Sequence, residues 1–204
     1  MTQVIPLQDV DLPRVMSALA NSANLFVNEI FDRVASDLAM LSDRDFQILE
    51  VSYEERADRP AGAEVIHVSF RFGIVDTDGE VRHGALLLPL PEAISLAAYL
   101  MMQPDSAVAE LRANTEIDHS LKEAMLEVGN FVAAAAESAL RAMNSRAQSV
   151  VFEGCQGVRA DVRPALKYQE GTPLAVGRAQ AVIAGAGPVE LVVMVPSADV
   201  LLAA

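Results

Sequence analysis

The hydrophobic positions of the chain follow a helical period in two long segments, residues 13–41 and 117–144. In each segment apolar side chains recur at alternating steps of three and four residues, which places them on one stripe of a helix. A shorter apolar segment, residues 91–102, begins with Pro91, a residue favoured in the first turn of a helix. The pattern therefore predicts two long amphipathic helices and one short helix.

Six other segments have the composition of β-strands. The clearest is 64–75, in which the residues alternate with a period of two, as expected of a strand with two different faces. Asp78-Gly79 then supplies a hairpin turn to the next strand. The stretch 155–170 is expected to be irregular. The predicted strands are 46–53, 64–75, 81–89, 148–154, 174–185 and 189–197.

The order helix–strand–strand–strand occurs twice, with the 91–102 helix added after the first set. This duplication predicts an α/β (α+β) fold with mostly antiparallel strands, two long helices and pseudo-twofold symmetry. We interpret residues 1–204 as a single domain made of two halves, about 1–105 and 106–204. Each half alone would have too little apolar material for its own core.

Composition narrows the classes of function. Apolar residues make up 52% of the 204 residues, which excludes an intrinsically disordered chain. The net charge is −13, and 20 of the 28 acidic residues lie in residues 1–120. Such a surface repels phosphate backbones and anionic lipid, so neither nucleic-acid nor membrane binding is expected.

The cellular context follows from two further features. Cys155 is the only cysteine, so no intrachain disulfide can form, and the first residues do not have the pattern of a signal peptide. The apolar segment 84–102 is interrupted by two prolines and a glutamate, which disfavours a membrane span. The expected location is the cytoplasm.

Several kinds of site are disfavoured by motif. The histidines are not spaced as zinc ligands, and Cys155 lies in no cysteine-hydrolase signature, so a structural role is favoured for it. The chain has neither a P-loop nor a dinucleotide-binding fingerprint, and the Gly-Ala-Gly at 185–187 favours a hairpin turn. The remaining candidate is the polar face of the 117–144 helix.

That face lies opposite the apolar stripe and contains an acid and an amide three residues apart. Glu127 and Asn130 are therefore neighbours on the helix surface. Small residues surround them, which would let another surface approach the helix backbone. Alone, such a face is typical of an ordinary solvated helix. The residues of this polar face are Glu123, Glu127, Asn130, Ala134, Glu137 and Arg141, and the small neighbours are Gly129, Ala133 and Ala134.

The setting of this pair is more informative than the pair itself. The segment LLLPLPEAISLAAYL at 86–100 is followed by a long helix that carries Glu127-Val128-Gly129-Asn130. This arrangement resembles the CheC/CheX/FliY family of chemotaxis phosphatases, in which a strand ends in a Pro-containing turn, a short helix follows, and the next long helix carries E-x-x-N. The duplicated plan fits the family along the whole chain, whereas the motifs are specific only over residues 84–140.

The chain departs from the family pattern at several points. Glu123 stands where the family usually has Asp or Ser, and the proline that commonly follows the Asn by some twenty residues is missing from that region. In two-site members the first long helix repeats the motif. Aligning the apolar stripes of the two helices places Asn21 opposite Glu127 and Asn24 opposite Asn130. This first copy has no acid, so we interpret it as degenerate and expect it to be inactive.

The resemblance implies a phosphatase that speeds hydrolysis of the phosphoaspartate of a CheY-type response regulator. Asn130 would orient the attacking water, and Glu127 would pair with the regulator's lysine. The Mg²⁺ would be supplied by the regulator, so the chain itself would need no metal or cofactor. Two alternatives stay open: a non-catalytic binding module that docks to a signalling or flagellar protein, and a structural oligomer subunit. Whether the chain is a monomer or a homodimer is also open.

Overall fold

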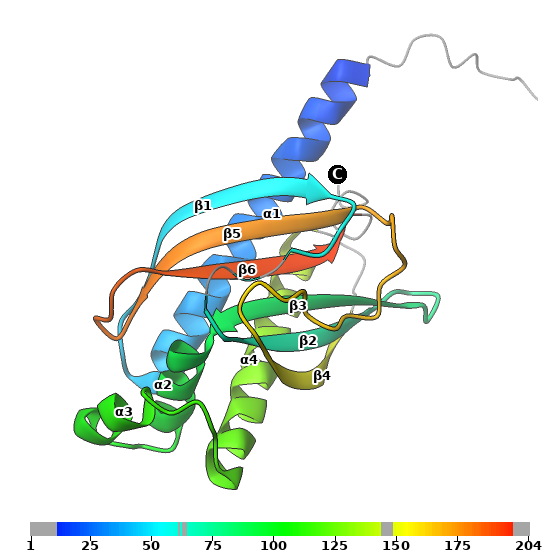
Figure 1. Ribbon diagram of the computed structural model, residues 1–204. Coiled ribbons are helices and arrows are strands. Elements are labelled where there is room, and N and C mark those ends of the chain that lie inside the picture. The colour runs from blue at the N-terminus through cyan, green and yellow to red at the C-terminus, as the bar shows by residue number, and fades with distance from the viewer. Residues whose placement is uncertain (1–11, 61, 63–64, 144–148, 198–204) are drawn as a thin grey trace, which may run out of the picture.

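The computed structural model describes residues 12–60, 62, 65–143 and 149–197. The described chain forms four helices and six strands. The strands form a curved sheet, and the helices pack against one side of it (Figure 1). In chain order these elements are α1 (Leu12–Ser42), β1 (Phe46–Arg56), β2 (His67–Val75), β3 (Val81–Pro89), α2 (Leu90–Leu100), α3 (Asp105–Leu111), α4 (His119–Met143), β4 (Ser149–Val158), β5 (Leu174–Ile183) and β6 (Val189–Pro196).

The six strands form one antiparallel sheet in the order β1-β5-β6-β3-β2-β4. When the first three strands are exchanged with the last three, the same order is read from the opposite end of the sheet. A pseudo-twofold axis therefore passes between β3 and β6, the strands that join the two halves. The predicted fold class is confirmed, while the boundary near residue 105 stays a prediction.

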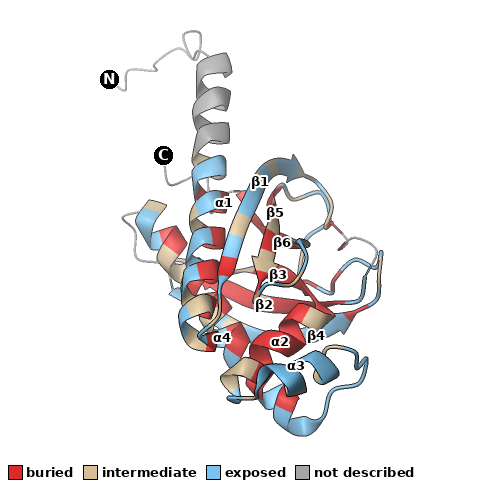
Figure 2. Cartoon of the chain, turned by 90° about the vertical axis from the view of Figure 1, so that its left-hand side faces the viewer, coloured by how far each residue is buried: buried red, intermediate tan, exposed pale blue. Residues whose placement is uncertain are grey.

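The long helices α1 and α4 lie side by side on one face of the sheet, with α2 beside them (Figures 1 and 2). Their buried sides face the strands, and this layer holds the main hydrophobic core. Burial of such large side chains is the principal favourable term in the free energy of folding. The largest fully buried side chains of this core are Phe26, Ile30, Phe31, Leu38, Phe70, Phe72, Ile74, Leu86, Leu88, Ile94 and Leu96.

The opposite face of the sheet is covered by irregular chain. A second, smaller core includes Leu166 and packs against Tyr168, both from the segment before β5. The Tyr168 hydroxyl lies within hydrogen-bond distance of two carbonyls, those of Ala57 and Thr172, the second at 2.9 Å, and its single proton is shared between them. Arg59 donates to the Pro164 carbonyl at 2.8 Å. These bonds hold the segment across the sheet without regular structure.

Several elements differ from the prediction at their ends. β1 extends to Arg56 instead of ending at 53, and α2 and β5 end two residues earlier than predicted, at Leu100 and Ile183. β4 extends to Val158 instead of ending at 154, because a bulge at Gly154 (φ +110°) lets the strand resume its pairing with β2. β2 begins at His67 rather than at 64. The link expected after α2 contains a helix, α3, whose seven residues are too few to reveal a helical period.

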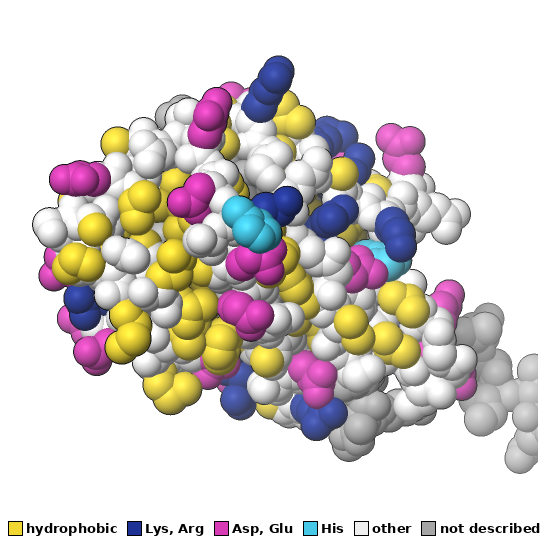
Figure 3. All heavy atoms as spheres, turned by 90° about the horizontal axis from the view of Figure 1, so that it is seen from below, with side chains coloured by type: hydrophobic (Ala, Val, Ile, Leu, Met, Phe, Trp, Pro, Cys, Tyr) yellow, Lys and Arg dark blue, Asp and Glu magenta, His cyan; other side chains and the backbone are white. Residues whose placement is uncertain are grey.

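Figure 3 shows the lower end of the molecule, where acidic side chains are scattered among apolar ones. The net charge of −13 is thus not gathered into one patch on the face that Figure 3 presents.

The described helices include none that combines the length and the apolar character required to cross a bilayer.

Candidate functional site

The candidate site lies on α4, whose start is fixed by Asp118. The Oδ1 atom of Asp118 accepts a hydrogen bond from the backbone N–H of Leu121 at 2.8 Å, which satisfies a free donor of the first turn. The apolar stripe is buried as predicted, except for Met143 at its end, which is half-buried. On the polar face, Glu137 is half-buried, and the other predicted residues are exposed: Glu123, Glu127, Asn130, Ala134 and Arg141.

Glu127 and Asn130 lie together on the outside of α4. The Asn130 Nδ2 donates a hydrogen bond to Glu127 Oε2 at 3.2 Å, and both residues are exposed. The second carboxylate oxygen, Oε1, has no partner in the part of the chain that the structure describes. The sequence thus places one carboxylate and one carboxamide side by side, open to a second molecule.

Gly129, between these two residues, faces the opposite way. A Cβ atom built on Gly129 would lie 2.1 Å from Cζ of Phe152, so the aromatic ring of β4 occupies the space of the missing side chain. Gly129 and Ala133 are both buried, and only Ala134 of the small neighbours is exposed. The expectation that these small residues admit another molecule is therefore wrong for Gly129, since the surface that approaches it is the chain's own strand. Ala133 is buried but lines a groove beside α4.

Gly129→Ala should destabilise the protein by about 1–2 kcal/mol. The strain of the new methyl group against Phe152 should exceed the stabilisation that the higher helix propensity of alanine provides. Urea unfolding followed by circular dichroism measures the change. Phe152→Ala is the matched background, since it removes the ring that the new methyl group would meet. In that background Gly129→Ala should be neutral or stabilising. If Gly129→Ala lowers the free energy of unfolding equally in both backgrounds, the Phe152 ring is not the reason for a glycine at this position.

A groove of about 390 Å³ begins at Asn130 and runs between α4 and β4. One of its walls is fixed by Glu137, whose Oε2 accepts a hydrogen bond from the Val150 backbone N–H at 2.9 Å and whose Oε1 pairs with Arg141 at 2.6 Å. The residues that line the groove are Asn130, Ala133, Ala134, Glu137, Ser138, Val150, Val151 and Phe152. The strand side of this groove could not be predicted from the sequence, because no local pattern reveals which strand lies beside a helix.

The first copy of the motif has a different local structure. Asn24 is exposed on α1, and its backbone carbonyl accepts a hydrogen bond from Asn28 Nδ2 at 2.7 Å. The backbone of Asn21 lies in α1, but its side chain lies outside the described part of the structure. Position 21, which corresponds to Glu127, holds asparagine, so this copy of the motif has no carboxylate there.

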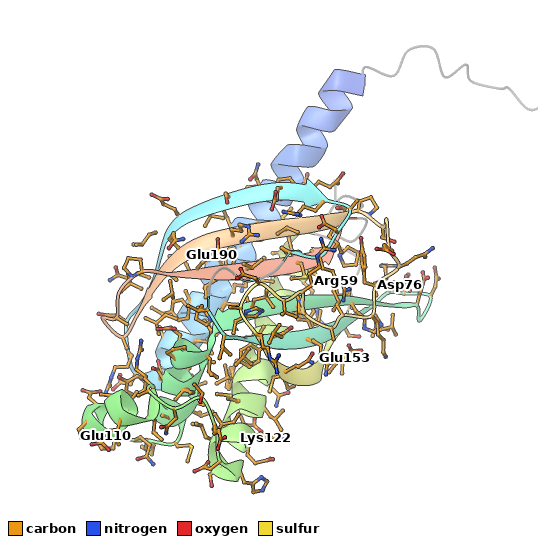
Figure 4. All side chains as sticks on the ribbon, viewed as in Figure 1. Arg59, Asp76, Glu110, Lys122, Glu153 and Glu190 are labelled. Atoms are coloured by element: carbon orange, nitrogen blue, oxygen red, sulfur yellow. The ribbon has the colours of Figure 1, made fainter. Side chains whose placement is uncertain are left out.

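The other residues considered for chemistry are dispersed. His67 is buried in β2, the His83 Nδ1 lies 2.9 Å from Glu153, and His119 is exposed near Glu123 at 3.8 Å. Figure 4 shows Glu153 on β4, well away from the sheet edge formed by β1. Among the described residues, no group of three or more His, Cys, Asp or Glu is placed to hold a metal ion.

Cys155 is half-buried in β4 rather than placed in an open site. Burial raises the pKa of the Cys155 thiol, although the positive charges of Lys122 and Arg71 act in the opposite direction. Lys122 projects from the lower part of α4 (Figure 4). A raised pKa disfavours the nucleophilic thiolate at neutral pH, which agrees with a structural role.

No protein-family profile and no curated protein matches the chain. Solved structures match over nearly the whole length. FliY of Thermotoga maritima is 15% identical with a TM-score of 0.60, and the match covers 95% of this chain and 94% of FliY.

Two other matches are similar in extent. The FliM middle domain of H. pylori is 10% identical with a TM-score of 0.63, over 92% of this chain and 98% of that one. CheX of Desulfovibrio desulfuricans is 13% identical with a TM-score of 0.53, over 83% and 97%. A FliG–FliM complex of H. pylori and a CheC-like superfamily protein of Shewanella also match. At these low identities the likeness concerns the fold alone, and the chain has the CheC-like fold that FliY, CheX and the FliM middle domain share.

Proposed function

We propose that the chain is a phosphatase that accelerates hydrolysis of the phosphoaspartate of a CheY-type response regulator in the cytoplasm. The observation that carries the proposal is the exposed Glu127–Asn130 pair, joined at 3.2 Å on the outer face of α4. Its fold is shared with FliY and with CheX, which is described as a chemotaxis protein. The regulator would bring its own Mg²⁺, so the chain needs to supply only a positioned amide.

Asn130 would act on water. Its Nδ2 is engaged by Glu127, which leaves Oδ1 to accept a hydrogen bond from a water molecule in line with the phosphorus. A carboxamide neither titrates nor attacks the phosphoryl group, so it orients water without competing chemistry. Phosphoryl transfer depends mainly on such positioning and on electrostatic stabilisation, and the regulator's metal would supply the latter.

Glu127 would bind the regulator and fix its position relative to Asn130. Its Oε2 keeps Asn130 in place, and its Oε1 has no partner in the described chain and can accept a lysine ammonium from the regulator. An ion pair that is partly desolvated on docking contributes more than an exposed pair. The two side chains thus have separate roles, one in docking and one in orienting water.

The test is the decay of a purified CheY-type regulator that has been phosphorylated with acetyl phosphate, measured with and without the chain. Glu127→Gln should raise the regulator concentration needed for half-saturation by about tenfold, because the neutral amide loses the ion pair but keeps the size of the side chain. The rate at saturation should fall much less. An unchanged half-saturation would assign Glu127 no role in docking.

A non-catalytic binding module is the second candidate. It is favoured by the match to a FliG–FliM complex, a structure in which a protein of similar fold is bound to FliG. The missing acid opposite Glu127 in α1 agrees with it as well. In this case the phosphorylated regulator or another protein would bind without faster loss of phosphate, which the same assay distinguishes.

A further inference from the structure

The groove between α4 and β4 continues directly from Asn130. Asn130 is itself one of the groove's lining residues, and the others follow it toward the carboxyl end of α4 and along β4. Any molecule large enough to enclose the Asn130 amide must therefore also lie over the groove. The question is which chemistry the groove offers to that molecule.

More of the groove's lining residues are apolar than polar. Ala134 is exposed on α4, and Val150 and Phe152 are half-buried on the face of β4 that meets α4. The one carboxylate in the wall, Glu137, is already satisfied by the Val150 N–H and by Arg141. Apolar side chains left partly in water, next to a charge that needs no further partner, favour a partner group that is apolar rather than cationic.

We propose that this groove is a second docking contact for the response regulator, and that it receives an apolar side chain of the regulator beside its phosphorylation site. The inference rests on the proposed function. Ala134 lies seven residues after Glu127, which corresponds to about 10 Å along the helix. The regulator must then present a cation and an apolar group about 10 Å apart, with the phosphoaspartate between them.

The groove also fixes on which side of α4 the regulator lies. In the alignment of the two long helices, the positions of Ala133 and Glu137 in α4 correspond to Val27 and Phe31 in α1. Both of these larger side chains are fully buried. The equivalent surface of α1 is thus built differently, and the regulator is placed over β4, at the far edge of the sheet from β1.

Ala134→Gln tests the contact, because the longer neutral side chain should occupy the groove that Ala134 lines. The matched control is Ala142→Gln, the same change at an exposed position of α4 that does not line the groove. We expect Ala134→Gln to raise half-saturation by the phosphorylated regulator about tenfold with little change in the saturated rate. Ala142→Gln should change neither.

Ala134→Leu is a second test at the same position. Its bulky side chain should also fill the groove and raise half-saturation, and it carries no polar group that could contact Asn130. Folded variants that match the wild type in half-saturation would overturn the inference, as would an equal effect of Ala142→Gln. A wild-type chain that leaves the decay of the regulator unchanged would instead overturn the proposed function itself.

Discussion

Asn130→Ala should lower the chain-catalysed rate of phosphoaspartate hydrolysis by about 10²-fold, since the water molecule would lose the group that aligns it with phosphorus. The expected loss lies in the rate at saturation. Half-saturation should change little, because Glu127 keeps its contact with the regulator. Single-turnover decay of the phosphorylated regulator, measured at several concentrations of the chain, separates the two quantities.

Asn24→Ala is the matched control for this experiment. Asn24 occupies the corresponding position of α1, is exposed, and lies in a copy of the motif that has no acid. Its replacement should leave hydrolysis unchanged. A wild-type rate in Asn130→Ala would remove Asn130 from the mechanism, and a loss in Asn24→Ala would show that the first copy is active.

Arg112→Ala should destabilise the fold by about 3 kcal/mol, because it strands a buried carboxylate. Glu92 in α2 is 3% exposed, and its Oε1 accepts a hydrogen bond from Arg112 Nη2 at 2.6 Å. The other terminal nitrogen of Arg112 donates to Ser95 Oγ at 2.9 Å. These bonds join α2 to the end of α3, so the loss should appear as a lower urea midpoint for the whole domain.

The compensating variant separates the stranded charge from lost packing. In Glu92→Leu/Arg112→Met, both charges are replaced by apolar groups, and most of the stability should return. Arg112→Lys should be intermediate, since one ammonium cannot reproduce both bonds of the guanidinium. If the double variant is as unstable as Arg112→Ala, packing rather than the unpaired carboxylate is the cause.

The long helices and most strands could be predicted because their patterns are local. α1 and α4 show their stripes over many turns, and the alternation in β2 continues for its whole length. Gly79 and Gly185 both have positive φ in the predicted hairpin turns. The exposed position of Glu127 and Asn130 follows from the same stripe, because residues opposite an apolar face must meet solvent.

What could not be predicted depends on contacts between distant segments. α3 is held in part by Arg44, which pairs with Asp105 at 2.8 Å, and seven residues carry no periodic signal of their own. The groove forms because Phe152 of β4 packs beneath Gly129 of α4. Neither segment has a sequence pattern that predicts this contact. The glycine inside a helix was nevertheless a usable signal, because its cost to helix stability calls for a packing reason.

The open flank of β4 has a consequence for how activity varies with concentration. β4 pairs only with β2 within the described sheet, so its outer backbone groups, apart from the Val150 N–H that donates to Glu137, can pair with another strand. Two copies joined through that flank would hide the surface that we assign to the regulator. Self-association there would therefore compete with the substrate, and the activity per chain would decline as the protein is concentrated.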